Sequence, residues 1–443
     1  MLSFIKVRGR NLWERLSTSF WVIPSLLSLV AIFLFGLLTY LDRHSALGSV
    51  PALNFFEPVG ATGARVILST IAGSTITIVG TVFSITILTL TLASSQFGPR
   101  LLKNFIRSRG NQFVLGSLIA TFIYSLAVLT TIEPQGNPDF VPRLAVDVAI
   151  VLALVNVGLL IYFIHHVAVS IQADNVIRDV TAMLLAQIEA TMPELEDQES
   201  ATQERTAGST KNWKTSETYD LESDRWGYIQ ALEQGTLLHL ACQCNLVLDI
   251  TEKPGNFVSI GQRLARIEAL EKPDTRLLRR LARAFVIGSQ RSPEQDIEYA
   301  IHQLVEIAVR ALSPGINDPH TAMACIDHLG SAFAQIVRRR FPADRLLDDQ
   351  GCMRVSLPTL TFAGAVAAGF NQIRQNASGN AAVLIRMLEV LKTLLDNTDN
   401  EEYRDVLRSH AEIVMDTAGS SLTQKSDLED ARSRWQQFEG AGR

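Results

Sequence analysis

Metal binding and anion binding are both chemically conceivable between residues 313 and 328. The donor atoms that divalent metals use are present on four side chains: Asp318, His320, Cys325 and His328. Their spacing matches no known ligand pattern, so we expect no metal. An anion would instead bind to the free backbone N–H groups at the N-terminus of a helix. The residues that would form this start are Ser313, Pro314, Gly315, Asn317, Asp318 and Pro319.

The same six residues also suit a purely structural corner between two helices. Asp318 is a favourable N-cap, and Pro319 suits the first helical position. We therefore keep both interpretations, a structural corner and a weak anion site. The helix before the corner should start at a capping box, Ser292–Gln295, with Pro293 at its first position. Its predicted buried face consists of Ile297, Ile301, Leu304, Ala308 and Ala311.

Motifs of known catalytic machinery are missing from the chain. It has no phosphate-binding Walker loop, no nucleophile elbow and no metalloprotease helix. Cys242 and Cys244 have no second cysteine pair with which to complete a zinc site. We expect neither an enzyme nor a cofactor.

A stripe of small and hydroxylated residues follows one side of a long uncharged segment, Val66–Pro99. Small residues allow membrane helices to approach closely, and Ser and Thr can donate to their own helix backbone, so the stripe is explained by ordinary packing. Alternatively, several copies of the segment surround a water-filled path. The pore-lining candidates are Thr70, Gly73, Thr77, Gly80, Thr81, Ser84, Thr91 and Ser95. The basic residues of the following loop would ring the inner mouth: Arg100, Lys103, Arg107 and Arg109.

The overall composition indicates a protein that is half embedded in a bilayer. The chain has 443 residues, only 19% of them charged, and its mean hydropathy is +0.17. A net charge of −5 argues against nucleic acid as a partner. Four uncharged stretches are long enough to span a membrane, and all precede residue 174. They are residues 19–41, the stretch between Arg65 and Arg100, that between Arg109 and Glu133, and that between Asp147 and Asp174.

Basic residues predict the orientation of these spans. They precede the first span and fill the loop between the second and third, whereas the other two loops have no basic excess. We therefore expect both termini, and the part of the chain after the fourth span, in the cytoplasm. His165 and His166 fall near the inner end of the fourth span, where we expect interfacial anchors. An amphipathic helix that buries Ile177, Val180, Leu184 and Ile188 should continue from that span as a rigid stalk.

The predicted fold is a four-helix membrane domain plus a cytoplasmic α+β domain. The predicted ranges are 1–192 for the membrane domain with its helical extension, 193–224 for a flexible polar linker, 225–273 for a small β module and 274–443 for a helical domain. Alternation within LLHLACQCNLVLDI, residues 237–250, predicts a strand with Cys242 and Cys244 in the core. Turn residues at Pro254, Gly255 and Gly261 make the module resemble half of a barrel-sandwich carrier domain, yet no lysine has the attachment context.

Four segments together resemble one family of bacterial membrane proteins, DUF2254. They are ASSQFGPRLL at 93–102, IYFIHHVA at 161–168, PGNFVSIG at 254–261 and RALSPGINDPHTA at 310–322. The resemblance covers nearly the whole chain. It implies a four-span inner-membrane protein with a cytoplasmic C-terminal domain, and it implies no activity.

The sequence thus leaves two hypotheses for the function. The first is a homo-oligomeric channel or channel-like transporter for a small ion, with the second span lining the path and the cytoplasmic domain assembling or gating it. The second is a membrane-anchored signalling or scaffold protein whose cytoplasmic domain binds a partner. The bilayer and further copies of the chain are the expected partners in the first case.

Overall fold

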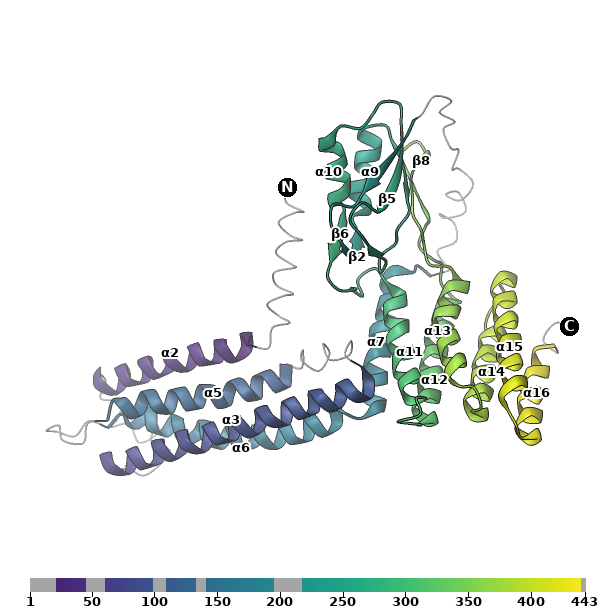
Figure 1. The fold of residues 1–443 in the computed structure, drawn as a ribbon. Coiled ribbons are helices and arrows are strands. Elements are labelled where there is room, and N and C mark those ends of the chain that lie inside the picture. Colours follow the sequence, from purple (N-terminus) through teal and green to yellow (C-terminus); the bar gives the residue numbers. More distant parts are fainter. Residues whose placement is uncertain (1–20, 45–59, 99–108, 133–140, 195–216, 440–443) are drawn as a thin grey trace. The chain divides into compact units, whose positions relative to one another are not determined.

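The computed structural model describes residues 21–44, 60–98, 109–132, 141–194 and 217–439. The chain divides into two compact units, Met1–Asn175 and Val176–Arg443. The division places the helix that follows the fourth span with the second unit, although the sequence grouped it with the membrane domain. Figure 1 shows the helices of the first unit and the mixed structure of the second.

The first unit consists of long apolar helices that lie side by side (Figure 1). Within the described ranges, four helices are long and apolar enough to cross a membrane. They are α2 (Val22–His44), α3 (Ala61–Phe97), α5 (Arg109–Thr130) and α6 (Arg143–Ser170). Each falls within or overlaps one of the four predicted stretches, which confirms that prediction at the level of helices. At 1.5 Å per residue, the 37 residues of α3 extend about 55 Å, well beyond a hydrocarbon core of about 30 Å.

Helix α5 is in contact with each of the other three helices of this unit. It approaches α2 closely at Gly116, where a Cβ atom would lie 2.8 Å from Leu27 Cδ1 and 2.9 Å from Pro24 Cα. A buried polar contact joins α5 to α6, because Asn156 donates to Thr121 Oγ1 and accepts from Ser117 Oγ, both over 2.8 Å. Hydrogen bonds between helices of this kind fix their register where little water is present.

Helix α7 (Ala173–Thr191) follows α6 after a short break, so the two do not form the continuous stalk that we predicted. Ile171 and Gln172 form a turn, and the Asn175 side chain donates to the Val169 carbonyl over 2.8 Å. The Val169 carbonyl also accepts from the Gln172 N–H over 3.3 Å, so side-chain and backbone bonds together close the end of α6. The amphipathic pattern itself is confirmed, because Ile177, Val180, Leu184 and Ile188 are all buried.

The described part of the second unit contains two sheets. One has the strand order β1-β5-β3-β8-β7 and the other β4-β2-β6. Most pairs are antiparallel, whereas β3 and β8 are parallel. The strands are β1 (Glu217–Glu222), β2 (Gly227–Leu232), β3 (Val247–Ile250), β4 (Phe257–Val258), β5 (Arg263–Ala269), β6 (Phe285–Gly288), β7 (Arg345–Leu347) and β8 (Met353–Ser356).

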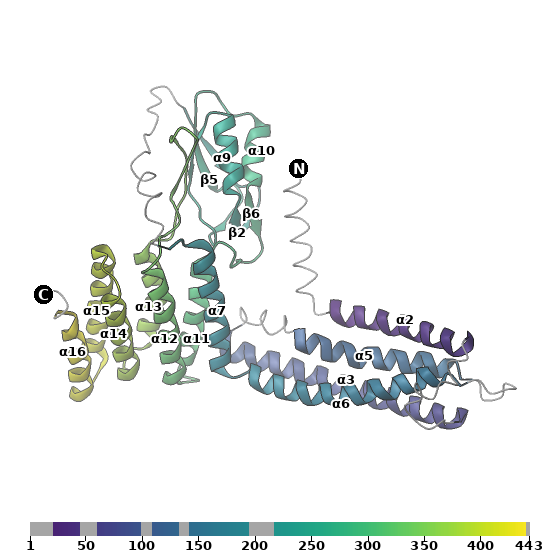
Figure 2. The same cartoon turned by 180° about the vertical axis from the view of Figure 1, so that it is seen from behind.

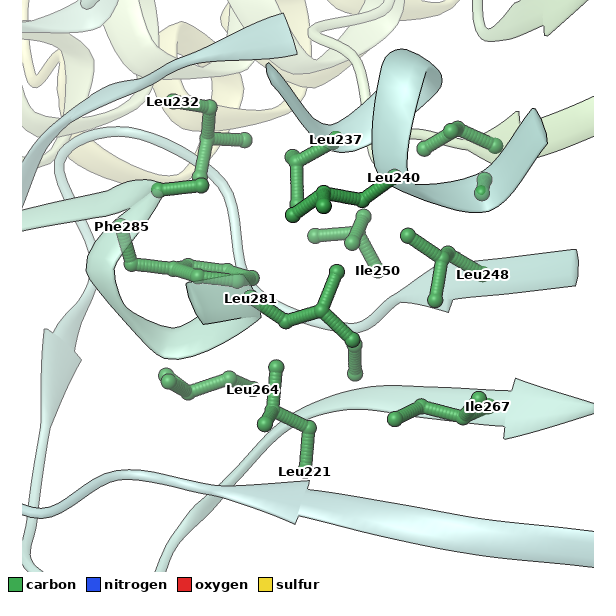
Figure 3. Packing of buried hydrophobic residues seen from close by; sticks show 14 of the residues in the cluster. Leu221, Leu232, Leu237, Leu240, Leu248, Ile250, Leu264, Ile267, Leu281 and Phe285 are labelled. Carbon is green, nitrogen blue, oxygen red and sulfur yellow. The ribbon is translucent and has the colours of Figure 1, made fainter. Parts of the chain in front are cut away.

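Helices α9 (Gln234–Gln243) and α10 (Thr275–Arg283) pack against these strands. Figure 3 shows Leu237 and Leu240 of α9 directed toward Leu248 and Ile250 of β3. Leu281 of α10 joins the same cluster, which is closed to solvent. Burial of this kind stabilises the folded chain by roughly 25 cal/mol for each Å² of apolar surface removed from water.

The remaining helices stand side by side, as the views from opposite sides in Figures 1 and 2 both show. They are α11 (Ile297–Ala311), α12 (Pro319–Ile336), α13 (Phe362–Asn376), α14 (Ala381–Asp396), α15 (Glu401–Ser421) and α16 (Lys425–Glu439). The ring of Phe333 packs on Phe370, with centroids 5.5 Å apart. Gly369 leaves room for Phe333, because a Cβ there would lie 2.9 Å from the ring.

The strands of this unit cross two predicted boundaries, at 224 and at 273. Strand β1 lies inside the predicted linker 193–224, because β5 supplies a partner and Leu221 is buried. Strands β6, β7 and β8 lie beyond the predicted β module 225–273, inside the predicted helical domain 274–443. The module is therefore discontinuous in sequence, and its resemblance to half a barrel-sandwich does not describe the sheets that form.

The predicted strand at residues 237–250 is a helix followed by a short strand. Leu237, Leu240 and Ala241 are buried at helical spacing, and Asn245 ends α9 with a φ of 50°. The Leu246 N–H donates to the Ala241 carbonyl over 2.8 Å, and the Asn245 N–H to the Cys242 carbonyl over 3.3 Å. This is the bonding of a Schellman cap. Cys242 and Cys244 are consequently exposed, not in the core as predicted.

Candidate functional site

All eight pore-lining candidates lie on the exposed side of α3. These residues, Thr70, Gly73, Thr77, Gly80, Thr81, Ser84, Thr91 and Ser95, are each exposed in the single chain. At 100° per residue, the buried side of α3 lies opposite the stripe on the helix. It includes Leu68, Val82 and Phe97. The stripe therefore faces away from α2, α5 and α6.

The hydroxyl groups of the stripe donate to their own helix. Thr77 donates to the Gly73 carbonyl over 2.9 Å, and Ser84 to the Gly80 carbonyl over 2.9 Å. Thr70, Thr81, Thr91 and Ser95 do the same three or four residues back. Each hydroxyl oxygen keeps lone pairs that can accept a bond from water or from another helix. The stripe can thus face lipid without an unsatisfied donor, and it can also line water.

Two glycines of the stripe leave open space beside the helix. A Cβ atom at Gly73 or Gly80 would meet nothing within 4 Å. Large side chains, including Ile76 and Phe83, stand exposed along one flank. The bundle-facing side of α3 is itself mostly small, with Ala64, Ala72, Thr75, Thr86, Thr89 and Ala93 among its buried residues. Large apolar residues therefore lie on both sides of the helix.

The basic residues of the predicted inner mouth are only partly described. Arg100, Lys103 and Arg107 lie outside the described residues, whereas Arg109 is the exposed first residue of α5. In α6, His166 stacks on Tyr162 with ring centroids 5.4 Å apart. Gly110 lies close to this pair, because a Cβ there would be 2.8 Å from the Tyr162 hydroxyl.

The corner between α11 and α12 has the predicted cap. The Thr321 N–H donates to Asp318 Oδ1 over 3.1 Å, and the Thr321 hydroxyl donates to Oδ2 over 2.6 Å. These bonds hold the pKa of the Asp318 carboxyl below its usual value. Pro319 occupies the first turn of α12, as predicted. Because the Asp318 carboxylate already occupies the start of α12, the geometry is that of a structural corner.

The backbone of the corner is tightly bonded. The Asp318 N–H donates to the Ala311 carbonyl over 2.7 Å, and the Asn317 N–H to the Ser313 carbonyl over 2.8 Å. The left-handed residue is Asn317, with a φ of 50°, while Gly315 is not among the residues with positive φ. Gly315 also has nothing within 4 Å of an added Cβ, so it is not required for steric reasons.

The candidate metal ligands near the corner do not converge. Cys325 is fully buried, and burial raises the pKa of its thiol. In the part of the chain that the structure describes, no group of three or more His, Cys, Asp or Glu side chains is placed to hold a metal ion.

The start of α11 differs from the predicted capping box. Asp296, not Ser292, is the N-cap, and its Oδ1 accepts from the Tyr299 N–H over 3.1 Å. Gln295 instead bonds the backbone of Leu232 in β2. The predicted buried face of α11 is confirmed at all five positions, Ile297, Ile301, Leu304, Ala308 and Ala311.

Asp296 is also the buried half of an ion pair. Its side chain is only 2% exposed, and Arg291 donates to both carboxylate oxygens over 2.8 and 2.9 Å. Burial raises the pKa of Asp296, against the opposite effect of Arg291. The turn at Gly255, with a φ of +93°, lies directly on this carboxylate, since a Cβ there would overlap Oδ2.

A cavity of about 390 Å³ lies beside this ion pair, within the second unit. Its apolar wall includes Met192, Leu232, Pro254, Ile297, Leu357 and Leu360. Its charged wall includes Lys253, whose Nζ lies 2.8 Å from Glu298 Oε1. This site could not be recognised in the sequence because its wall comes from six separate parts of the chain. The one local signal was the Pro254–Gly255 turn.

Comparison with known proteins places the chain in a family. The model of the family described as "Predicted membrane protein (DUF2254)" matches residues 17–393, most of the chain. The chain belongs to the DUF2254 family. Membership confirms the resemblance of the four segments at 93–102, 161–168, 254–261 and 310–322. The structure describes residues 93–98 of the first segment and the other three completely.

Similar family members occur in mycobacteria. An uncharacterised protein of Mycobacterium tuberculosis strain H37Rv, Rv1290c, is 30% identical over 433 residues, which are 95% of this chain and 80% of that protein. An uncharacterised protein of Mycobacterium bovis, Mb1321c, gives the same values. No solved structure matches the chain.

Proposed function

We propose that this DUF2254 protein is a homo-oligomeric channel or channel-like transporter for a small ion in the bacterial inner membrane. In this proposal, several copies of α3 surround the path, and the second unit assembles or gates the oligomer from the cytoplasm. The observation that carries it is the position of the small, hydroxylated stripe on the side of α3 opposite its own bundle.

The spacing of the stripe supports contact between copies of α3. Thr70, Thr77, Ser84 and Thr91 recur every seven residues, and Gly73 and Gly80 share the same interval. A seven-residue repeat keeps one side of a helix facing its neighbours when the helices cross at a small left-handed angle. Small side chains at those positions allow close approach. Hydroxyl oxygens that stay exposed at the contact could replace part of the hydration shell of an ion.

Electrical recording in planar bilayers tests the proposal directly. The purified full-length protein should give discrete conductance steps. Ser84→Leu, which fills the stripe with an apolar side chain, should reduce the conductance at least tenfold, whereas Phe83→Leu, an exposed neighbour on the flank, should leave it unchanged. A silent protein, or equal effects of the two variants, would contradict the channel.

Cysteine accessibility tests the lining separately from conduction. Cys242 and Cys244 are exposed and must first be replaced by serine, because they would react with any thiol reagent. Cysteines at Thr77 and Ser84 should then react with a membrane-impermeant reagent, and a cysteine at buried Val82 should not. Inert cysteines at both stripe positions would leave the stripe as a packing surface.

The proposed orientation has its own test. Reporter fusions after Gly48 and Gly136 should report the periplasm, and fusions after Gly110 and Gly208 the cytoplasm. A cytoplasmic signal after Gly136 would remove the four-span topology from the proposal.

The alternative, a membrane-anchored scaffold, is favoured by an exposed apolar patch on the second unit. Trp226 and Phe257 are 63% and 49% exposed, with ring centroids 6.4 Å apart. Ile260, which is 67% exposed, lies in the turn whose Gly261 N–H bonds the Ser223 carbonyl. Exposed patches of this kind often mark protein contacts. A photo-cross-linking residue in place of Trp226 should give a discrete adduct with a different protein in cells if the scaffold is correct, and none if the channel alone is.

A further inference from the structure

We infer that the cavity of the second unit is a binding site for a small zwitterion with an apolar body, such as an apolar α-amino acid. The inference starts from the charges on the cavity wall. It does not depend on whether the four spans conduct ions.

The wall has one exchangeable ion pair. Lys253 and Glu298 are 2.8 Å apart, with side chains 27% and 19% exposed, so both can still be reached from the cavity. The other carboxylate of the wall, Asp296, is saturated by two bonds from Arg291 and by the Tyr299 N–H. The ligand therefore meets one ammonium and one carboxylate.

These two charges determine which ligand fits. An anion that bound Lys253 alone would leave the Glu298 carboxylate without its partner in a partly desolvated site, and a cation on Glu298 would leave Lys253 in the same condition. A ligand with one charge of each sign, placed between them, would give both side chains a new partner. The exchange preserves two opposite-charge contacts, so it avoids the penalty of an unpaired charge.

Most of the remaining wall is apolar and favours an apolar body of limited size, although Thr191, Gln234, Gln295 and Thr359 also line the cavity. Met192, Ile297, Leu357 and Leu360 line the cavity together with the rigid prolines Pro254, Pro342 and Pro358. A volume of about 390 Å³ lies near the lower end of small-molecule sites, which suits a single amino acid or a similar molecule. Because proline fixes the backbone, this wall changes little on binding.

The geometry also explains how Lys253 is positioned. Gly255 lies against Asp296, and its N–H donates to the Ile229 carbonyl over 2.8 Å. The Asn256 N–H closes the turn on the Lys253 carbonyl over 3.1 Å. This turn is therefore hydrogen-bonded to β2 and packed against the start of α11. Glu298 lies two residues after Asp296 in the same segment. The two charges face each other because both elements meet at the Arg291–Asp296 pair.

Isothermal titration of the full-length protein in detergent tests the inference. L-Phenylalanine and L-leucine should each bind with a stoichiometry of one per chain. N-Acetyl-L-phenylalanine and L-phenylalaninamide, which each lack one charge, should bind at least tenfold more weakly, as should glycine, which lacks the apolar body. Failure of both amino acids to bind at millimolar concentration would overturn the inference, and so would equal binding of the acetylated or amidated forms.

Variants of the ion pair locate the binding. Lys253→Gln and Glu298→Gln should each weaken binding of L-phenylalanine at least tenfold. The double variant, which leaves neither charge without its partner, should bind as weakly while thermal unfolding stays close to that of the wild type. Lys392→Gln is the matched control, since Lys392 pairs with Asp396 outside the cavity. If the control weakened binding as much as Lys253→Gln, the binding would not be at the cavity. Binding that survives both cavity variants would also refute the site.

Discussion

Most described helices of the second unit begin with a side-chain cap from a neighbouring residue, with α9 an exception, whereas α3 and α6 of the first unit have no such cap. Six helices of the second unit have such caps, at Asp274, Asp296, Asp318, Thr361, Asn380 and Asn400. The N-caps of α3 and α6 are Gly60 and Pro142, which provide no side-chain bond.

The start of α6 is instead satisfied from another helix. Asp42 of α2 accepts from the Leu144 and Ala145 N–H groups over 3.4 Å, across more than a hundred residues of sequence. A local cap works in water, where solvent can replace it at small cost. Near a bilayer, water is scarcer, and a cap that also joins two helices combines hydrogen bonding with packing. The start of α6 thus depends on a contact between helices, whereas the starts of the six capped helices depend on neighbouring residues.

The largest expected effect concerns a cap that is also an ion pair. Asp296→Ala should lower the free energy of unfolding of the second unit by about 3–5 kcal/mol, because it leaves Arg291 largely buried and without its carboxylate. Thermal unfolding of the full-length protein in detergent measures this. Asp220→Ala is the control, since the Asp220–Arg263 pair is exposed and should contribute less than about 1 kcal/mol. Similar losses in the two variants would show that Asp296 is only an ordinary cap.

The next largest effects are the losses of stability when either kind of cap is removed, the cap from another helix at Asp42 or the local cap at Asp318. Asp42→Ala should cost about 1–3 kcal/mol, the range for polar groups left unsatisfied away from water. Asp318→Ala should cost about 1 kcal/mol, because water replaces the carboxylate at the start of α12. Unfolding temperatures, together with hydrogen exchange at Leu144 and Ala145, distinguish these outcomes. A larger loss for Asp318→Ala would reverse the comparison.

Two substitutions in the corner between α11 and α12 should differ in their effect on stability, because only one of them strains the backbone. Asn317→Val should destabilise the second unit by about 1–2 kcal/mol, because a β-branched residue is strained at a φ of 50°. Gly315→Val should change stability by less than about 0.5 kcal/mol, since Gly315 has open space around an added Cβ. Paired melting curves of the two variants test this, and a more severe effect at Gly315 would contradict the described corner.

The smallest expected effect is a pH dependence of the stability that the Asp318 cap contributes. The pKa of Asp318 is lowered from 3.8, mainly by the bond from the Thr321 side chain. Its stabilising contribution is therefore complete above pH 3.8 and is lost as the pH falls through the lower pKa of the folded state. The difference in melting temperature between Asp318→Asn and the wild type should shrink between pH 6 and pH 3. A difference that stays constant over this range would exclude the ionised carboxylate as its cause.

Features that depend on neighbouring residues could be predicted from the sequence. The four apolar helices, the cap at Asp318 and the buried face of α11 each follow from patterns within one segment. The start of α11 could not be predicted in this way, because Ser292 and Asp296 are both good caps. Tertiary contacts decide between them: Arg291 holds Asp296, and Gln295 bonds β2.

Two further errors have similar physical causes. Residues 237–250 contain leucines at both strand and helix spacing, and the buried surface offered by β3 and β5 selects the helix α9. The cavity could not be predicted at all, because Lys253 and Glu298 are 45 residues apart and meet only through the fold. For the stripe of α3, sequence identified the residues, and the structure adds that they face away from their own bundle.

The place of β8 in the large sheet affects how the protein can be made. Strand β3 ends at Ile250, and its parallel partner begins at Met353, after α11 and α12. At about 5–20 residues per second, a ribosome needs roughly 5–20 s to add the intervening residues. During that time the edge of β3 is exposed to other chains, and nascent chains on the same messenger are the nearest ones. Slow translation between these two strands should therefore favour aggregation, and a gene truncated before residue 353 should yield an insoluble product.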